Sequence, residues 1–233
     1  KMLKLSFPVN IDQPIATYSI PYGYIVRPCD GEEEPGQQWI DITGQATNKR
    51  GEKLVYGLSL CNDGKYSYDV KDSEMRLTVL RSPPYAYHVP HELKPNLIYR
   101  YIDQGWQDFN FILLPHRDSW RETHIVKLAE ELNLRPIVVV DYPHKGDLQS
   151  SHSFIEINRK NIIVSALKMH EDSEDVVLRC YETEGRETEA EIKLPFLKRK
   201  WTAKFKPCEI KTFIIPRKPD SKIVETDMLE FRT

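Results

Sequence analysis

The 233-residue sequence lacks the segments that take a chain into or across a membrane. It contains no run of about eighteen apolar residues, the length that a transmembrane helix needs. It also has no secretory signal, in which a basic start precedes an apolar stretch and a cleavage site with small residues. We therefore expect no membrane partner.

The sequence also lacks a charge of one sign. Its 33 Lys and Arg residues nearly balance 35 Asp and Glu residues, which leaves a net charge of −2. A nucleic-acid-binding domain usually shows a basic stripe. The single basic run, "LKRKWTAKFK", is typical of a solvated strand face. No nucleic-acid partner is expected.

Cysteine is scarce and dispersed. The chain has four cysteines and no C-x-x-C spacing, which argues against a disulfide framework or a zinc knuckle. It has no N-glycosylation sequon either. These observations predict four reduced thiols and a cytoplasmic location. The residues concerned are Cys29, Cys61, Cys180 and Cys208.

The sequence carries no self-contained catalytic motif. H-E-x-x-H, G-x-S-x-G, the Walker loop and G-x-G-x-x-G are all missing. His88 and His91 could share a metal ion on a loop, but a catalytic zinc ion takes three protein ligands. We predict no catalytic residue, metal site or cofactor within this chain.

What the sequence does contain is strand pattern. Short segments rich in Val, Ile, Leu, Phe and Tyr alternate with polar residues and are separated by 16 prolines and 10 glycines. This pattern predicts a mostly β protein built from antiparallel sheets with one buried face. The clearest segments are 4–11, 16–26, 53–60, 65–70, 75–80, 96–102 and 107–115.

One of these segments permits two interpretations. In "KYSYDV", Tyr66, Tyr68 and Val70 fall on one face and Asp69 falls on the other. The simpler interpretation is a hairpin whose aromatic face packs inward. The alternative is a wall of a site that presents Asp69 and, just beyond, Arg81.

One helix is predicted. Ser119 and Glu122 form the spacing of a capping box, apolar residues follow at helical intervals, and Pro136 would end the helix. Beyond it, residues 141–153 show no periodicity and are typical of a linker.

Three regions follow from these patterns. Residues 1–145 are expected to form a large β-sandwich, and residues 146–216 a small C-terminal β-sandwich. Residues 217–233 form a charged tail, which would either add a strand at "KIVE" or stay mobile.

Several segments together carry a resemblance to a known family. "GLSLCNDGKYSYDVKDSEMRL" and the following "VLRSP" resemble the C-terminal β region of glycoside hydrolase family 38, the retaining α-mannosidases, in its bacterial and vacuolar-cytosolic branch. Further matches lie in the same order along residues 1–216. They are "LKLSFPVNI", "ATYSIPYGYIVRP", "QWIDITG", "DFNFILLPH", "SWRETHIVKLAEELN", "SFIEI", "NIIVSALKMHEDSEDVVLRCYETEGR" and "FKPCEIKTFII".

The resemblance implies an architecture and a role. Enzymes of this family have an N-terminal domain with zinc and two catalytic carboxylates, then a helical bundle, a large sandwich of the galactose-mutarotase type and a small sandwich. This chain would hold only the two sandwiches. Its start at Lys1 also suggests a piece of a longer protein. Its partners would be the N-terminal catalytic and helical domains of the same protein and a mannosyl oligosaccharide.

The resemblance also suggests residues that reach the sugar. In related enzymes the β region lends a tyrosine and an arginine to the pocket. Tyr18 matches the tyrosine, Tyr22 is the alternative, and Arg81 lies in the neighbourhood of the arginine; Asp69 is a further candidate. After "RSP" the chain departs from the family pattern with "PYAYHVPHELK", so the contacts of that loop differ.

The leading hypothesis is a C-terminal accessory region of an α-mannosidase that is inactive alone. Its first rival is a stand-alone carbohydrate-binding sandwich, and its second is a mutarotase-like enzyme, which fold alone does not establish. A region severed from neighbouring domains should expose an apolar face, with residues 3–26 contributing unpaired edges. We therefore expect that this face can associate with a second copy to form a homo-oligomer.

Overall fold

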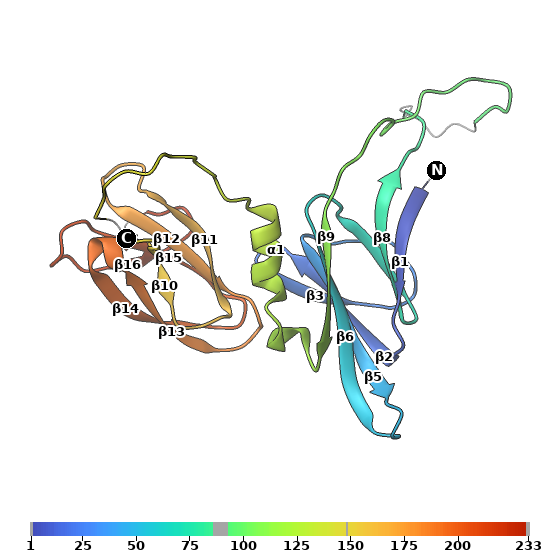
Figure 1. Ribbon diagram of the computed structural model, residues 1–233, viewed down its shortest axis with the longest axis horizontal. Helices are drawn as coiled ribbons and strands as arrows, with labels where there is room; N and C mark the ends of the chain where they lie inside the picture. Colours follow the sequence, from blue (N-terminus) through green and yellow to red (C-terminus); the bar gives the residue numbers. More distant parts are fainter. Residues whose placement is uncertain (1, 86–92, 148, 232–233) are drawn as a thin grey trace. The chain divides into compact units, whose positions relative to one another are not determined.

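The computed structural model describes residues 2–85, 93–147 and 149–231 (Figure 1). The chain forms two compact units. The first comprises Lys1–Ile20 and Ile25–Arg135, and the second comprises Pro21–Tyr24 and Pro136–Thr233. No helix within the described residues is long and apolar enough to span a bilayer.

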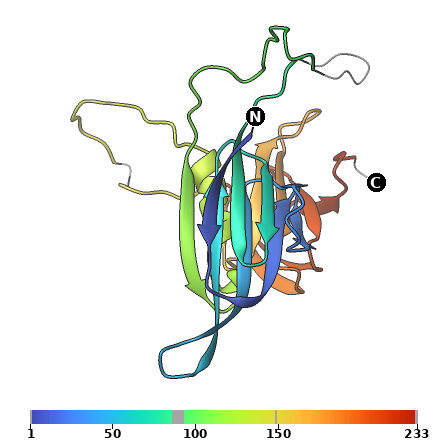
Figure 2. The same cartoon turned by 90° about the vertical axis from the view of Figure 1, so that its right-hand side faces the viewer.

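The first unit is a β-sandwich of two antiparallel sheets (Figures 1 and 2). One sheet has the strand order β1-β8-β7-β4, and the other has the order β3-β2-β5-β6-β9. The strands are β1 (Met2–Pro8), β2 (Asp12–Ile20), β3 (Gly23–Arg27), β4 (Glu34–Pro35), β5 (Trp39–Thr47), β6 (Lys53–Asn62), β7 (Ser67–Lys71), β8 (Glu74–Arg81) and β9 (Phe111–Arg117).

The core of this sandwich follows the period-two pattern of the sequence. Tyr68 and Val70 on β7 point inward and are buried, as the hairpin interpretation predicts. Tyr66 is exposed because it precedes β7, so that part of the prediction is wrong. The opposite sheet supplies Tyr18 and Ile40 to the same core.

The first segments are paired within the chain. Strand β1 pairs with β8 along its whole length, from Met2 to Pro8, and β2 lies between β3 and β5. The expectation that the partners of residues 3–26 are missing is therefore wrong for β2. Within the described residues, β1 and β3 are edge strands, each paired with one neighbouring strand.

The predicted helix forms as two pieces. Ser119 caps a short 3₁₀ turn, η1 (Trp120–Glu122), by accepting a hydrogen bond from the N–H of Arg121. Thr123 then adopts an extended backbone, and its hydroxyl accepts from the N–H of Ile125 at 3.1 Å. The α-helix α1 (Ile125–Asn133) therefore begins later than the capping box predicts, and it buries Ile125 and Ala129.

The second unit contains the smaller sandwich. A three-stranded sheet with the order β10-β13-β14 packs on a four-stranded sheet with the order β11-β12-β15-β16. The elements are β10 (Glu156–Ile157), β11 (Ile162–Met169), β12 (Val176–Glu182), β13 (Thr188–Leu194), η2 (Pro195–Leu197), β14 (Arg199–Phe205), β15 (Ile210–Ile215) and β16 (Val224–Thr226).

The tail resolves an alternative that the sequence leaves open. Part of "KIVE" forms β16, which pairs with β15. Further on, Glu230 is buried and accepts hydrogen bonds or ion pairs from Arg179 and Lys168 on the outer face of the same sheet. The tail thus supplies the edge strand β16, and Glu230 beyond it is anchored to the sheet by ion pairs.

Together the two units confirm the predicted class: a mostly β chain with one α-helix and two antiparallel sandwiches.

Candidate functional site

Charged side chains of the first unit gather on the outer face of the β1-β8-β7 sheet. Asp69 on β7 points away from the core, because its neighbours Tyr68 and Val70 point inward. Its carboxylate is fully buried beneath two cations, Lys4 from β1 and Arg76 from β8, and is ion-paired with both.

A second carboxylate joins this network. Glu33 accepts hydrogen bonds from Ser67 and Thr78, each at 2.5 Å, and lies 3.5 Å from the ammonium group of Lys4. Burial alone would raise the pKa of Glu33, but these two hydroxyls and the Lys4 charge hold it below its usual value. The Glu33 carboxylate therefore remains ionised at neutral pH.

The arrangement of this network suits stabilisation of the sheet and not catalysis. Two carboxylates face two cations, and Asp69 already accepts from both Lys4 and Arg76. A general base needs a carboxylate with a free lone pair within reach of the substrate. Asp69 is buried and held by both cations, so its arrangement supports positioning and stability.

Tyr18 packs in the core of the first unit. Its ring meets Tyr68 edge to face at 6.0 Å between centroids, and the guanidinium of Arg27 lies 5.6 Å from the ring centroid. Its hydroxyl is buried and has no hydrogen-bond partner among the described residues. Burial, followed by the charges of Cys29 and Asp69, raises the pKa of Tyr18 well above its usual value. An orphaned buried hydroxyl is rare in a core tyrosine.

The other candidates lie apart. Tyr22 belongs to the second unit, where its ring meets Tyr181 edge to face at 5.2 Å, and its φ of 58° marks a tight turn. Arg81 is exposed at the end of β8. It lies five positions beyond Arg76, the strand partner of Asp69, a distance of about 16 Å along an extended strand. The structure therefore does not bring Asp69 and Arg81 together.

Sequence reasoning missed a polar cluster on the outer face of the other sheet. Asp41 on β5 is fully buried, and its carboxylate accepts hydrogen bonds from Ser59 at 2.7 Å and Thr43 at 2.6 Å. His116 on β9 lies 2.7 Å from the same carboxylate. The sequence signal that could have found this cluster is Asp41, an aspartate between two isoleucines in "WIDI".

Glycine makes room for this cluster. A Cβ on Gly57 would lie 2.3 Å from the ring of His116 and 2.7 Å from the hydroxyl of Thr43. The missing side chain at Gly57 therefore leaves room for the His116 imidazole beside β6. Burial would lower the pKa of His116, but the hydrogen bond and charge of Asp41 outweigh it and raise the pKa above its usual value.

This cluster is not a nucleophilic triad. A Ser-His-Asp triad needs the serine hydroxyl bonded to the histidine, with the aspartate behind it. Here Asp41 stands between the two and takes a hydrogen bond from each. No relay runs from Ser59 to His116, so the arrangement stabilises the sheet and activates no nucleophile.

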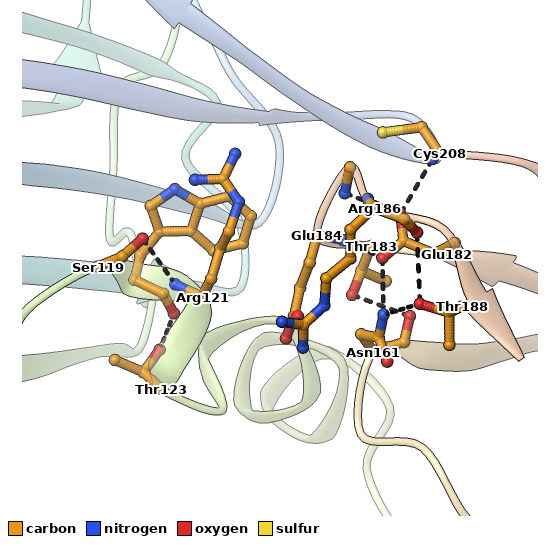
Figure 3. A network of polar contacts seen from close by, with 12 residues as sticks. Ser119, Arg121, Thr123, Asn161, Glu182, Thr183, Glu184, Arg186, Thr188 and Cys208 are labelled. Atoms are coloured by element: carbon orange, nitrogen blue, oxygen red, sulfur yellow. Dashed lines mark hydrogen bonds and ion pairs between the residues drawn. The ribbon is translucent and has the colours of Figure 1, made fainter. Parts of the chain in front are cut away.

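The second unit also buries carboxylates, and the most enclosed is that of Glu182. The carboxylate of Glu182, at the end of β12, is fully buried (Figure 3). It accepts an amide hydrogen bond from Asn161 at 2.8 Å and four more from backbone N–H groups. The backbone donors are Glu184, Gly185, Arg186 and Cys208, at 2.7–3.1 Å.

Metal-binding chemistry is not found in the part of the chain that the structure describes. No three His, Cys, Asp or Glu side chains there lie close enough to hold a metal ion. His88 and His91 lie outside the described residues. The four cysteines are free thiols in the structure.

A hollow of about 400 Å³ opens on the second unit. The half-buried Trp201 lines it and packs edge to face on Phe213 at 5.4 Å. Charged side chains complete the lining, among them Lys222 and Glu225. An aromatic ring beside charged groups could hold a small polar ligand.

Two family models match the chain, in order and without overlap. The model of the glycosyl hydrolases family 38 C-terminal domain matches residues 1–89. The model of the glycosyl hydrolases family 38 C-terminal beta sandwich domain matches residues 161–213. Together they match more than half of the chain.

Curated relatives agree with these models. Alpha-mannosidase 2C1 of Mus musculus is 26% identical over 196 residues, which cover 79% of this chain and 17% of that protein. Alpha-mannosidase G of Dictyostelium discoideum is 27% identical over 198 residues and is matched over 81% of this chain and 16% of its own length. The chain therefore spans about one sixth of the length of these relatives.

Solved structures share the fold. An alpha-mannosidase from Enterococcus faecalis superposes on 92% of this chain with a TM-score of 0.68 and 15% identity, and 26% of its own length is matched. A second structure, of a glycosyl hydrolase family 38 protein from the same organism, gives a TM-score of 0.69 at 16% identity, with 92% of this chain and 26% of its own length covered.

By the two family models and these relatives, the chain belongs to glycosyl hydrolase family 38 and comprises C-terminal domains of that family.

Proposed function

We propose that this chain is the C-terminal accessory region of a retaining, zinc-dependent α-mannosidase that removes terminal α-D-mannose from oligosaccharides. The observation that carries the proposal is the ordered match of both C-terminal family models, at residues 1–89 and 161–213. In this role the chain packs on the catalytic domain, completes it, and is inactive alone.

The state of its buried carboxylates supports this role. Retaining glycoside hydrolysis needs two carboxyl groups about 5–5.5 Å apart, one nucleophile and one acid–base. Asp69, Asp41 and Glu182 are instead held by internal partners. Catalysis would then depend on carboxylates supplied by another part of the enzyme.

The remaining partners follow from the same proposal. The N-terminal catalytic and helical domains of the same protein would cover the sandwiches, and zinc would belong to the catalytic domain. The large sandwich would be of the galactose-mutarotase type. We place the enzyme in the cytoplasm, since its four free cysteines suit a reducing compartment.

Four residues remain proposed contacts of the β region with the mannosyl substrate: Tyr18, Tyr22, Asp69 and Arg81. Arg81 is the most accessible of them, because it is exposed at the end of β8. Tyr18 would need its neighbours to move aside before its orphaned hydroxyl met a sugar.

Kinetics of the intact enzyme test these contacts. Arg81→Ala should lower kcat/KM by about 1.5–3 kcal/mol in transition-state stabilisation, since it removes a charged hydrogen bond. Tyr18→Phe deletes only the orphaned hydroxyl, so it should lower kcat/KM without lowering stability. Wild-type kinetics in both variants would assign the two residues to core or rim.

The first experiment on the chain alone is an assay with p-nitrophenyl α-D-mannoside and added zinc. We expect no turnover above the blank. Turnover that a chelator abolishes would contradict the proposal, because it would place the whole active site within these 233 residues.

Carbohydrate binding without an enzyme is the second candidate function. The hollow beside Trp201 favours it, because an indole ring can pack on the apolar face of a pyranose. Titration with mannose, followed by tryptophan fluorescence, separates the two. Saturable quenching that Trp201→Ala abolishes would favour a binding module, whereas no response supports the accessory role.

A further inference from the structure

The most exposed apolar segment of the chain follows α1. Ile137, Val138, Val139 and Val140 are 94%, 80%, 82% and 90% exposed. No strand forms here, as both cartoon views show (Figures 1 and 2). Monomeric proteins rarely leave such a contiguous apolar run in water.

The run has the composition of a strand. Its four residues are all β-branched, which favours the extended backbone. Among the described residues, no backbone hydrogen bond is made by any of them. A segment with apolar side chains and unsatisfied N–H and C=O groups is suited to pairing edge to edge with another strand.

We propose that residues 134–142 pair antiparallel with the same residues of a second copy of this chain, about a two-fold axis at Val138. The reason is that the sequence "LRPIVVVDY" is complementary to itself when it is reversed. About Val138, Ile137 meets Val139 and Pro136 meets Val140. The next pairs are Arg135 with Asp141 and Leu134 with Tyr142.

Charge selects this orientation. In the antiparallel register, Arg135 of each copy lies opposite Asp141 of the other, so both ends of the ribbon carry opposite charges. Parallel pairing would place like charges opposite one another. Arg135 and Asp141 are exposed in their present ion pairs, with Asp63 at 3.3 Å and His144 at 2.9 Å, so both can exchange partners.

The pleat agrees with the register. Alternate residues share a face, so Leu134, Pro136, Val138, Val140 and Tyr142 form one wholly apolar face of the ribbon. A second face carries the remaining apolar residues between the two charges.

Proline also fits. In an antiparallel pair the hydrogen-bonded and non-hydrogen-bonded positions alternate. If Val138 occupies a non-hydrogen-bonded position, Pro136 and Val140 do so as well. Pro136 then loses no hydrogen bond through its missing N–H. Ile137 and Val139 would exchange the central backbone bonds.

Such a contact is an isologous interface of the kind that closed dimers use. A two-stranded ribbon alone is only marginally stable in water. The association is therefore expected to be weak and concentration-dependent. A cross-link at the axis captures it better than gel filtration does.

The experiment places cysteines in the run. Across the axis the two copies of residue 138 face each other at a non-hydrogen-bonded position, with Cα atoms about 4.5 Å apart, which lies within the range of about 4.4–6.8 Å that a disulfide spans. Val138→Cys should therefore form a disulfide-linked dimer under mild oxidation. Val140→Cys is the matched control, because it changes the same residue type at a similarly exposed position that faces residue 136 instead.

We expect Val138→Cys to cross-link at least about ten times faster than Val140→Cys, with the 138–138 peptide identified by mass spectrometry. Equal rates, or no cross-link in either variant, would overturn the proposal. The run would then belong to a different partner, such as the remainder of a longer family 38 protein.

Charge reversal gives a second readout that does not need a cysteine. Arg135→Asp should weaken dimerisation about tenfold in sedimentation velocity, because each end then pairs two carboxylates. The double variant R135D/D141R should restore it. A double variant as weak as the single one would contradict the register. Neither test depends on mannosidase activity, so their outcome is independent of the proposed function.

Discussion

In the first sandwich the buried carboxylates of Asp69 and Asp41 are met by side chains that can carry positive charge, whereas in the second the carboxylate of Glu182 is met by backbone N–H groups. Asp69 pairs with Lys4 and Arg76. Glu182 takes four backbone hydrogen bonds and one amide bond, with no ion pair to any described residue.

The difference separates two ways of burying charge. Long side chains such as Arg76 remain partly in water, so the first network can rearrange when one member is lost. Backbone donors are fixed by the turns that present them, and Glu182 in return holds those turns in place. Losing Glu182 should therefore cost more than losing one cation of the first network.

The largest effect is expected from Glu182→Ala. It leaves the backbone N–H groups of the β12–β13 and β14–β15 turns without their acceptor, and each unpaired buried group costs about 1–3 kcal/mol. Because such costs are not additive, we expect a loss of about 4 kcal/mol in the free energy of unfolding. Denaturant unfolding followed by circular dichroism measures it.

Glu189→Ala is the control for this measurement. Glu189 lies on β13 of the same unit, is largely exposed, and lies 3.5 Å from Lys204. Its loss should change stability by less than about 0.5 kcal/mol. Similar effects in the two variants would mean that the turns hold themselves without the buried carboxylate.

A smaller effect is expected from Arg76→Met in the first unit. It leaves Asp69 buried with Lys4 as its remaining cation. Breaking a buried pair usually costs about 3–5 kcal/mol, but Arg76 is 26% exposed and Lys4 stays, so we expect about 2 kcal/mol.

Lys127→Met provides the matched exposed pair. Lys127 and Glu131 are 67% and 59% exposed at i,i+4 spacing on α1, so the loss should be below about 0.5 kcal/mol. If Arg76→Met were equally harmless, Asp69 would not depend on its cations, and the contrast between the units would fail.

The sequence predicts the local parts of this picture and misses the non-local ones. Alternation in "KYSYDV" identifies Tyr68 and Val70 as core residues and Asp69 as outward-facing. It does not identify Lys4 as a partner of Asp69, because the two residues are 65 positions apart and meet only when β1 pairs with β8. The same holds for Asp41 and His116, which are 75 positions apart.

The helix shows a local failure of another kind. The spacing of Ser119 and Glu122 correctly marks a helical start, but the hydroxyl of Thr123 competes for the backbone. It donates to the carbonyl of Trp120 and accepts from the N–H of Ile125, and so divides the helix into η1 and α1. Family resemblance indicated the fold class, whereas these contacts came only from the structure.

A pH-dependent contribution should distinguish the first unit. The folded pKa of His116 is raised, so its stabilising contribution is fully present below the unfolded pKa and is lost as pH rises through the folded value. The difference in stability between wild type and His116→Gln should therefore be larger at about pH 5.5 than at about pH 9. A difference that is constant with pH would mean that His116 never becomes charged in the fold.

The smallest effects are expected at the cysteines, of which each unit has one buried and one half-buried: Cys61 and Cys29 in the first unit, Cys180 and Cys208 in the second. Burial raises the pKa of Cys61 and of Cys180 to about 12, so neither thiol should alkylate until its unit opens. Under denaturing conditions without reductant, all four should label.

In the native protein Cys180 would then report opening of the second unit and Cys61 opening of the first. Glu182→Ala should speed labelling of Cys180 by about 100-fold or more and leave Cys61 unchanged, as peptide mass spectrometry can resolve. Equal acceleration of Cys61 would show that the two units open together, and the contrast between Asp69 and Glu182 would then have no separate consequence for stability.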